Sequence, residues 1–144
     1  MNIKYVEATK ESIDEIFEIN KALIDKYEDI SKIDYSYVLS WVKEKVTNYI
    51  QEYKTILYAS KKAGYVRIID EGERIEIDDL FVNEEFQNKG IGTYTLLKII
   101  KENKQKPICL YVFIKNVGAV RLYKRLGFKV KSIIKETRYL MEYK

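Results

Sequence analysis

The stretch from Leu80 to Thr93 reads LFVNEEFQNKGIGT and combines the end of a strand, a turn and the start of a helix. Alternating apolar residues predict a strand over residues 74–82, and helical spacing predicts a helix over about residues 90–103. The first turn of a helix leaves backbone N–H groups unpaired at the positive end of its dipole. Gly90 and Gly92 have no side chain, so a phosphate could approach those N–H groups closely.

Taken alone, this glycine pair has a plainer interpretation. A Gly-x-Gly sequence also occurs where a helix packs tightly against a strand, or in an ordinary turn. The stretch has neither the Gly-Lys-Ser/Thr of a P-loop nor the third glycine of a dinucleotide-binding turn. The two glycines therefore indicate an anion site only together with a second feature.

A second segment, Asn116–Phe128, reads NVGAVRLYKRLGF. It predicts a short helix with Asn116 as its N-cap and Gly127 as the left-handed residue after its C-terminus. Tyr123 lies one turn before the end of that helix. Its plainer interpretation is that it is one of 13 tyrosines, with its hydroxyl in water.

The rest of the chain predicts a single α/β (α+β) domain over residues 1–144, a mixed sheet flanked by helices. Thr9 and Ser12 are candidate N-caps of a first helix, with Glu15 completing a capping box, and a second helix is expected from Asp34. The element order is βααβββαβαββ. The predicted strands cover residues 2–7, 55–60, 64–70, 74–82, 108–114, 128–134 and 137–143, with turns at residues 60–62 and 70–72.

Composition excludes several kinds of chemistry. The 144 residues include no His, so His-based nucleophilic catalysis and His-ligated metal sites are excluded. Cys109 is the one cysteine and is expected to be a buried apolar residue, in a reducing, cytoplasmic setting. The net charge of +4 is too small to require nucleic acid or a membrane surface as partner. No apolar segment predicts a signal peptide or a membrane span.

The two segments together, Gln87-x-x-Gly90-x-Gly92 and Asn116-x-x-Ala119-x-x-x-Tyr123-x-x-x-Gly127-Phe128, closely resemble the GCN5-related N-acetyltransferase (GNAT) superfamily. The resemblance implies a metal-independent transfer of an acetyl group from acetyl-CoA to a primary amine, by direct attack through a tetrahedral intermediate. The amine would belong to a small molecule or to a protein lysine. The residues that match the family's cofactor-binding positions are Leu80, Phe81, Val82, Gln87, Asn88, Lys89, Gly90, Ile91, Gly92, Thr93 and Asn116.

The resemblance also implies where each part of acetyl-CoA lies and which residue returns a proton. The diphosphate would lie on the amides of residues 87–92, and pantetheine would enter a splay between the strands over 74–82 and 108–114. Tyr123 matches the tyrosine that protonates the departing thiolate. The chain departs from many members of the family in having Asn88 in place of Gly and Glu84 in place of Pro. Asn tolerates the left-handed backbone region, so the cradle is expected to persist.

Three carboxylates on the predicted fourth strand are candidate catalytic groups: Glu76, Asp78 and Asp79. An amine is almost fully protonated at neutral pH and must lose a proton before it can attack a thioester. Glu76 matches the catalytic Glu of the histone-acetylating branch, so it is the first choice as general base, directly or through water. Strand alternation predicts Glu76 and Asp78 on one face and Asp79 on the other. The alternative is that all three are solvated acids that attract a cationic acceptor.

Three other questions stay open. The chain could be a catalytically silent acyl-CoA-binding module, and an RNA-binding module is disfavoured by the modest charge. It is expected to be a monomer or a homodimer. Tyr35, Tyr37 and Trp41 in the second helix are either core residues or walls of an acceptor pocket.

Overall fold

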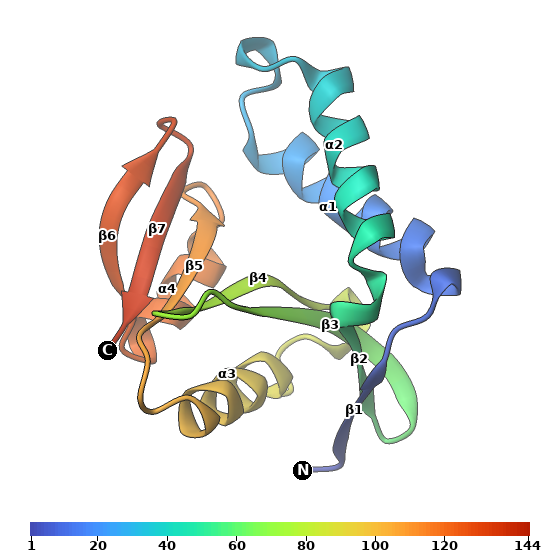
Figure 1. Cartoon of the computed structure of the whole chain (residues 1–144), viewed down its shortest axis with the longest axis vertical. Coiled ribbons are helices and arrows are strands. Elements are labelled where there is room, and N and C mark those ends of the chain that lie inside the picture. Colours follow the sequence, from blue (N-terminus) through green and yellow to red (C-terminus); the bar gives the residue numbers. More distant parts are fainter.

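The computed structural model describes residues 1–144 and contains one seven-stranded sheet in the order β1-β2-β3-β4-β5-β7-β6 (Figure 1). All neighbouring strands are antiparallel except β4 and β5, which are parallel. The strands are β1 (Ile3–Glu7), β2 (Tyr53–Tyr58), β3 (Lys61–Asp70), β4 (Ile75–Val82), β5 (Ile108–Phe113), β6 (Lys129–Ile134) and β7 (Arg138–Tyr143). The helices are α1 (Ile13–Tyr27), α2 (Tyr35–Asn48), α3 (Ile91–Glu102) and α4 (Val117–Arg125). The predicted element order and mixed sheet are confirmed.

Helices cover both faces of the sheet, with α1 and α2 on one side of β4 and α3 on the other (Figure 1). Between the sheet and α3 and α4, buried side chains such as Ile77, Leu96 and Phe128 form the larger core. A second core under α1 and α2 includes Ile16 and Val46. Each such side chain contributes about 1.5–3 kcal/mol when fully buried. None of the helices has the length and apolar composition that crossing a membrane would require.

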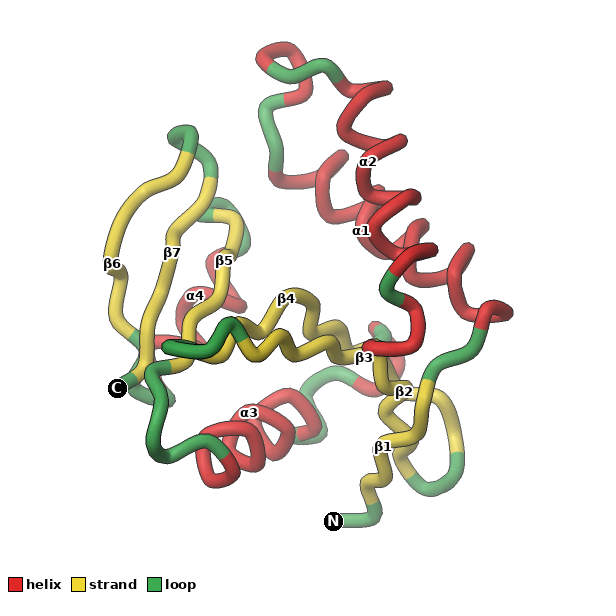
Figure 2. Tube along the Cα trace, in the orientation of Figure 1, coloured by secondary structure: helices red, strands yellow, loops and turns green.

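The strands β4 and β5 separate after a short stretch of pairing. Their parallel ladder joins residues 75–77 to residues 108–110 and then stops. Beyond it β5 turns away from β4 (Figure 2), so one edge of β4 from Asp78 to Val82 has no strand beside it. An unpaired strand edge offers N–H and C=O groups to an extended ligand.

A β-bulge lies at Asp78 on β4. Two consecutive residues of β3 pair with Asp79 and Ile77, which leaves Asp78 without a partner. A one-residue bulge resets the alternation of side chains, so Asp79 joins Glu76 and Asp78 on the face that carries α1 and α2. Lys45 of α2 confirms this, since its Nζ lies 3.2 Å from Asp78 Oδ2 and 3.6 Å from Asp79 Oδ2. The prediction that Asp79 lies on the opposite face is wrong.

The predicted capping box at the start of α1 does not form. Ser12 is buried in a 3-10 turn with helical backbone angles, and its side chain caps no N–H group. Glu15 instead accepts a hydrogen bond from the Tyr65 hydroxyl at 2.9 Å. By contrast, the predicted start of the second helix at Asp34 is confirmed, and the Asp34 side chain caps α2 by accepting from the Tyr37 N–H at 3.2 Å.

The turn between β2 and β3 lies one residue earlier than predicted. Ala59 and Ser60 both have positive φ, 50° and 69°, so the chain reverses within two residues. That backbone is typical of the tight hairpin turns that match strand twist. Lys61 and Lys62 therefore already belong to β3.

Gly64 on β3 has no room for a side chain, because a Cβ there would lie 1.8 Å from the Phe81 carbonyl oxygen of β4. We expect Gly64→Ala to lower the free energy of unfolding by about 3 kcal/mol, since the two strands must move apart. Gly118→Ala is the matched control. A Cβ there meets nothing within 4 Å, so alanine should stabilise α4 slightly. Urea unfolding measures both; equal effects would contradict this packing.

Candidate active site

The segment between β4 and α3 presents a continuous row of free backbone N–H groups. The amides from Asn88 to Thr93 donate to no acceptor in the protein, and the first bond of α3 runs from the Tyr94 N–H to the Gly90 carbonyl. Asn88 and Gly90 have φ of 63° and 82°, so the left-handed backbone expected at Asn88 is confirmed. Left-handed residues beside a helix start curve successive N–H groups around a concavity suited to an anion.

The glycine at residue 92 leaves space where three elements meet. A Cβ there would lie 3.8 Å from Leu122 Cδ2 of α4 and 3.9 Å from Val82 Cγ2 of β4, which is ordinary contact. Packing within the protein therefore does not demand glycine. The free amides, the open space and the helix N-terminus fit a diphosphate group, with Lys89 exposed beside them.

Gln87 holds the segment in place rather than adding to the row of amides. Its side-chain Nε2 donates to the Val82 carbonyl at 2.9 Å, which ties the turn to the end of β4. Its own N–H donates to the Glu84 carbonyl at 3.2 Å, within the 3-10 turn Glu84–Phe86. The row of free amides thus begins at Asn88, one residue later than the resemblance implies.

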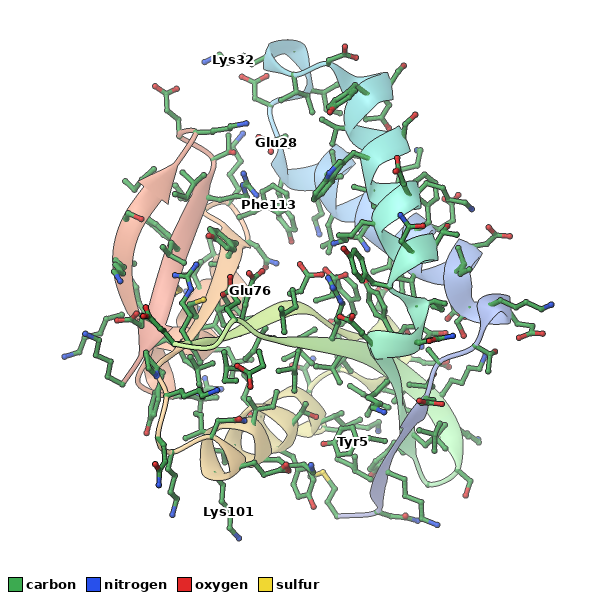
Figure 3. The ribbon with its side chains drawn as sticks, in the orientation of Figure 1. Tyr5, Glu28, Lys32, Glu76, Lys101 and Phe113 are labelled. Carbon is green, nitrogen blue, oxygen red and sulfur yellow. The ribbon has the colours of Figure 1, made fainter.

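Glu76 is the one acid of β4 that has no ion-pair partner in the protein. Its carboxylate accepts no hydrogen bond and forms no salt bridge, and it lies half-buried on the face below α1 and α2 (Figure 3). Burial, and then the charge of Asp78, raise the pKa of Glu76 above its ordinary value. A carboxylate with a raised pKa is a better proton acceptor near neutral pH.

Asp78 and Asp79 belong instead to a network of ion pairs. Asp78 Oδ2 accepts from Arg67 at 2.8 Å and from Lys45 at 3.2 Å. Asp79 is buried, accepts from the Tyr53 hydroxyl at 2.5 Å, and has its pKa raised by burial. Lys45 and Arg67 therefore neutralise these two carboxylates. Carboxylates paired in this way are better suited to stabilising the bulge than to transferring a proton.

The network depends on residues that the sequence alone does not reveal. Lys45 lies 33 residues before Asp78 in the sequence, on another element. Arg67 lies on the neighbouring strand β3 and is buried at 5% exposure although it is charged. Removing one partner from such a buried network leaves an uncompensated charge. One local feature pointed to the bulge: the run IEIDDL breaks its apolar alternation at the two consecutive aspartates.

Tyr123 on α4 has a hydroxyl without a protein partner. Burial alone raises the pKa of Tyr123 to about 12, and no hydrogen bond offsets it. The ring packs against Phe128 at 5.9 Å between centroids. The preceding residue, Leu122, lies opposite residue 92, so α4 packs beside the start of α3.

Two further sequence predictions concern α4 and β5. The side chain of Asn116 caps α4 by accepting from the Ala119 N–H at 3.3 Å, and Gly127 has φ of 105°, so both capping predictions are confirmed. Cys109 is buried at 1% exposure, and burial raises the pKa of its thiol. It behaves as a small apolar core residue, as expected.

The aromatic residues of α2 divide into two groups. Tyr37 and Trp41 are exposed and share one helix face with Lys45, at four-residue spacing. Since Lys45 reaches β4, this helix face borders the space above Glu76. Tyr35 is directed elsewhere, and its hydroxyl donates to Asp25 at 2.5 Å.

A sequence profile of the Acetyltransferase (GNAT) family matches residues 14–128. The chain belongs to the GNAT family. The match runs from the first turn of α1 to Phe128, just before β6, so it includes β4, the row of free amides and Tyr123. Family membership confirms the resemblance carried by the two motifs, and with it the predicted GNAT fold.

Known proteins similar to this GNAT chain carry acetyltransferase names. An uncharacterised N-acetyltransferase of Methanocaldococcus jannaschii is 33% identical over 85 residues, covering 57% of this chain and 38% of that protein. A spermine/spermidine N(1)-acetyltransferase of Bacillus subtilis is 38% identical over 60 residues, covering 39% of this chain and 40% of that protein. The chain thus matches about two fifths of the length of these curated relatives.

Among solved structures, the PaiA N-acetyltransferase of Thermoplasma acidophilum, in complex with coenzyme A, superposes with a TM-score of 0.73. The superposition covers 100% of this GNAT chain and 99% of that chain, at 23% sequence identity. At this identity the likeness concerns the fold. The similarity therefore extends over the full set of strands and helices.

Proposed function

We propose that this protein transfers an acetyl group from acetyl-CoA to a primary amine of a small molecule or a protein lysine. One observation carries the proposal: the free amides from Asn88 to Thr93 follow the unpaired edge of β4, and just before that edge the same strand bears Glu76, which has no salt-bridge or hydrogen-bond partner. The GNAT family and the names of its similar members support the same activity.

Binding in this proposal uses backbone groups. The amides from Asn88 to Thr93 hold the diphosphate, assisted by the helix dipole of α3. Leu80, Phe81 and Val82 offer their free edge to the pantetheine amides, as an added strand would be held. Asn116, at the start of α4, contributes a side-chain contact to the pantetheine arm in this proposal. Acetyl-CoA, when bound, supplies the activated thioester.

The chemistry uses two side chains and one backbone group. Glu76 takes a proton from the ammonium group of the acceptor, directly or through water, which frees the nitrogen lone pair for attack. A backbone N–H near Phe81 or Val82 stabilises the negative charge that develops on the carbonyl oxygen. Tyr123 then donates its hydroxyl proton toward the departing sulfur. Asp78 and Asp79 keep β4 in the bulged shape that presents Glu76.

Thiol release in the presence of acetyl-CoA and a pooled set of primary amines tests the activity. The proposal expects amine-dependent release of free CoA. Stabilisation by CoA in thermal unfolding, with no thiol release from any amine, would instead favour the silent acyl-CoA-binding module. If CoA did not raise the melting temperature at all, both the acetyltransferase and the silent acyl-CoA-binding module would be contradicted.

Replacing Tyr123 with Phe should lower kcat about tenfold without abolishing turnover, because a thiolate leaves fairly well without a proton donor. The KM for acetyl-CoA should stay near the wild-type value. Since its pKa is about 12, Tyr123 remains protonated and contributes no loss of activity up to mildly alkaline pH.

Tyr143→Phe is the matched control for this prediction. Tyr143 also packs against Phe128, at 5.6 Å between centroids, but it comes from β7. Removing its hydroxyl should leave kcat unchanged. If Tyr123→Phe turned over at the wild-type rate under saturating acetyl-CoA, Tyr123 would have no part in proton transfer.

A further inference from the structure

Most charged side chains on β4, β5 and β7 form salt bridges, but two do not. These strands carry five: Glu76, Asp78, Asp79, Arg138 and Glu142. Asp78 and Asp79 are paired with Lys45 and Arg67, and Glu142 is paired with Lys131 and Lys144. Of the five, only Glu76 and Arg138 form no salt bridge. One is an anion and the other a cation.

Arg138 lies on the same face of the sheet as Glu76. It pairs directly with Phe113 across β5 and β7, so both side chains point to one face. Phe113 packs against Tyr27 of α1, with ring centroids 6.0 Å apart, which identifies that face as the one carrying α1 and α2. Figure 3 shows Phe113 and Glu76 facing the same space beside these helices.

The guanidinium of Arg138 is incompletely satisfied. Its Nε is buried and has no hydrogen-bond partner, and the adjacent Thr137 hydroxyl is in the same condition. The Arg138 guanidinium lies over the Tyr111 ring, with 5.9 Å between Cζ and the ring centroid. Leaving a buried charged donor unpaired is costly, whereas a carboxylate can accept two parallel bonds from the guanidinium fork.

The spacing along β5 limits what could join the two charges. Glu76 lies beside Cys109 on β5, and Arg138 lies beside Phe113, four residues further along. Four residues of strand span about 13 Å. The guanidinium shortens this distance, because it leans back over Tyr111. A spacing of this order between the two positions suits an ammonium and a carboxylate held several carbons apart rather than the pair in an α-amino acid, where both groups are bonded to one carbon.

We propose that Arg138 is a specificity-determining residue that binds a carboxylate on the acceptor, while the amine of the same molecule lies at Glu76. The acceptor class is therefore an amine with an anionic group several carbons away, an ω-amino acid or the equivalent end of a peptide. This inference rests on the proposed transfer to an amine.

Two probes that differ by one charge test the inference: 6-aminohexanoate and its neutral amide, 6-aminohexanamide. Titration calorimetry in the presence of CoA gives their affinities, and thiol release from acetyl-CoA gives their kcat/KM. The wild-type protein should prefer the acid by about tenfold or more in both measurements. Arg138→Met should remove that preference, because it weakens binding and use of the acid far more than binding and use of the amide. Arg138→Lys should restore part of it, because it keeps the charge but not the planar fork.

Lys129→Met is the matched control. Lys129 is an exposed cation that pairs across from Glu142 and so lies on the same face, and it forms no salt bridge. Its removal changes the net charge equally and should keep the preference for the acid. Equal affinity of the wild type for the two probes, or a preference that survives in Arg138→Met, overturns the inference. An Arg138-dependent preference in calorimetry without thiol release from any amine supports the role of Arg138 and overturns the proposed activity instead.

Discussion

A Gly92→Asp variant should lose at least about 100-fold in affinity for CoA, because its carboxylate would stand where the diphosphate binds and like charges repel strongly at close range. The stability of the folded protein should not decrease. Residue 92 lies in the first turn of α3, where an acidic side chain interacts favourably with the helix dipole, by about 0.3–1 kcal/mol. Calorimetric titration with CoA and thermal unfolding together separate the two effects.

Two controls show whether the loss comes from the diphosphate. Gly92→Ala adds only a methyl group in ordinary contact with Leu122 and Val82, so it should bind CoA much as the wild type does. S-acetylpantetheine lacks the diphosphate, so Gly92→Asp and the wild type should transfer its acetyl group at the same rate. If Gly92→Asp bound CoA with wild-type affinity, the diphosphate would lie elsewhere.

A Glu76→Gln variant should lower kcat about 100-fold, within the usual range for loss of a general base. A base must be deprotonated, so in the wild type the rate should rise with pH through the pKa of Glu76. That pKa is raised above 4.5 by burial, so the rise should occur above 4.5. The variant should lack this acidic limb. The pH dependence of kcat/KM at saturating acetyl-CoA measures the change.

Stability should move in the opposite sense from activity. The pKa of Glu76 is higher in the folded protein than in the unfolded protein. The protonated side chain therefore stabilises the fold at low pH, and this stabilisation is lost as pH rises through the folded-state pKa. Glutamine removes that cost, and Glu76→Gln should be at least as stable as the wild type at neutral pH. Asp78→Asn is the contrasting variant. It weakens the ion pairs to Arg67 and Lys45, so it should lower the melting temperature yet keep the acidic limb. An acidic limb that persists in Glu76→Gln would assign the base elsewhere.

The features that the sequence predicted correctly depend on neighbours within a few residues. The cap at Asn116 and the left-handed backbone at Asn88 and Gly127 follow from local preferences of Asn and Gly. The glycine turn before α3 is local in the same way. Together with Tyr123 at its fixed spacing, it was enough to indicate the family.

The features that the sequence did not predict depend on distant contacts. Ser12 and Glu15 fit a capping box, but burial of Ser12 and the hydroxyl of Tyr65 on β3 determine their conformation. The bulge at Asp78 places all three acids on one face, and cations from α2 and β3 then compensate two of them. Which acid stays free therefore follows only from the assembled sheet.

Arg138 illustrates the same limit. In the sequence it is one basic residue of a lysine-rich hairpin, with nothing to distinguish it from its neighbours. Pairing of β7 with β5 places it opposite Phe113, on the face that carries Glu76. This register places Arg138 and Glu76, which both lack a salt bridge, on the same face of the sheet.

The backbone amide resonances of the ¹⁵N-labelled protein, recorded during titration with CoA, test most directly whether the start of α3 holds the diphosphate. CoA should produce its largest shifts at the amides from Asn88 to Thr93, and pantetheine should leave those resonances nearly unmoved. Saturable binding of CoA with the largest shifts elsewhere, and no selective change in this row, would contradict the account.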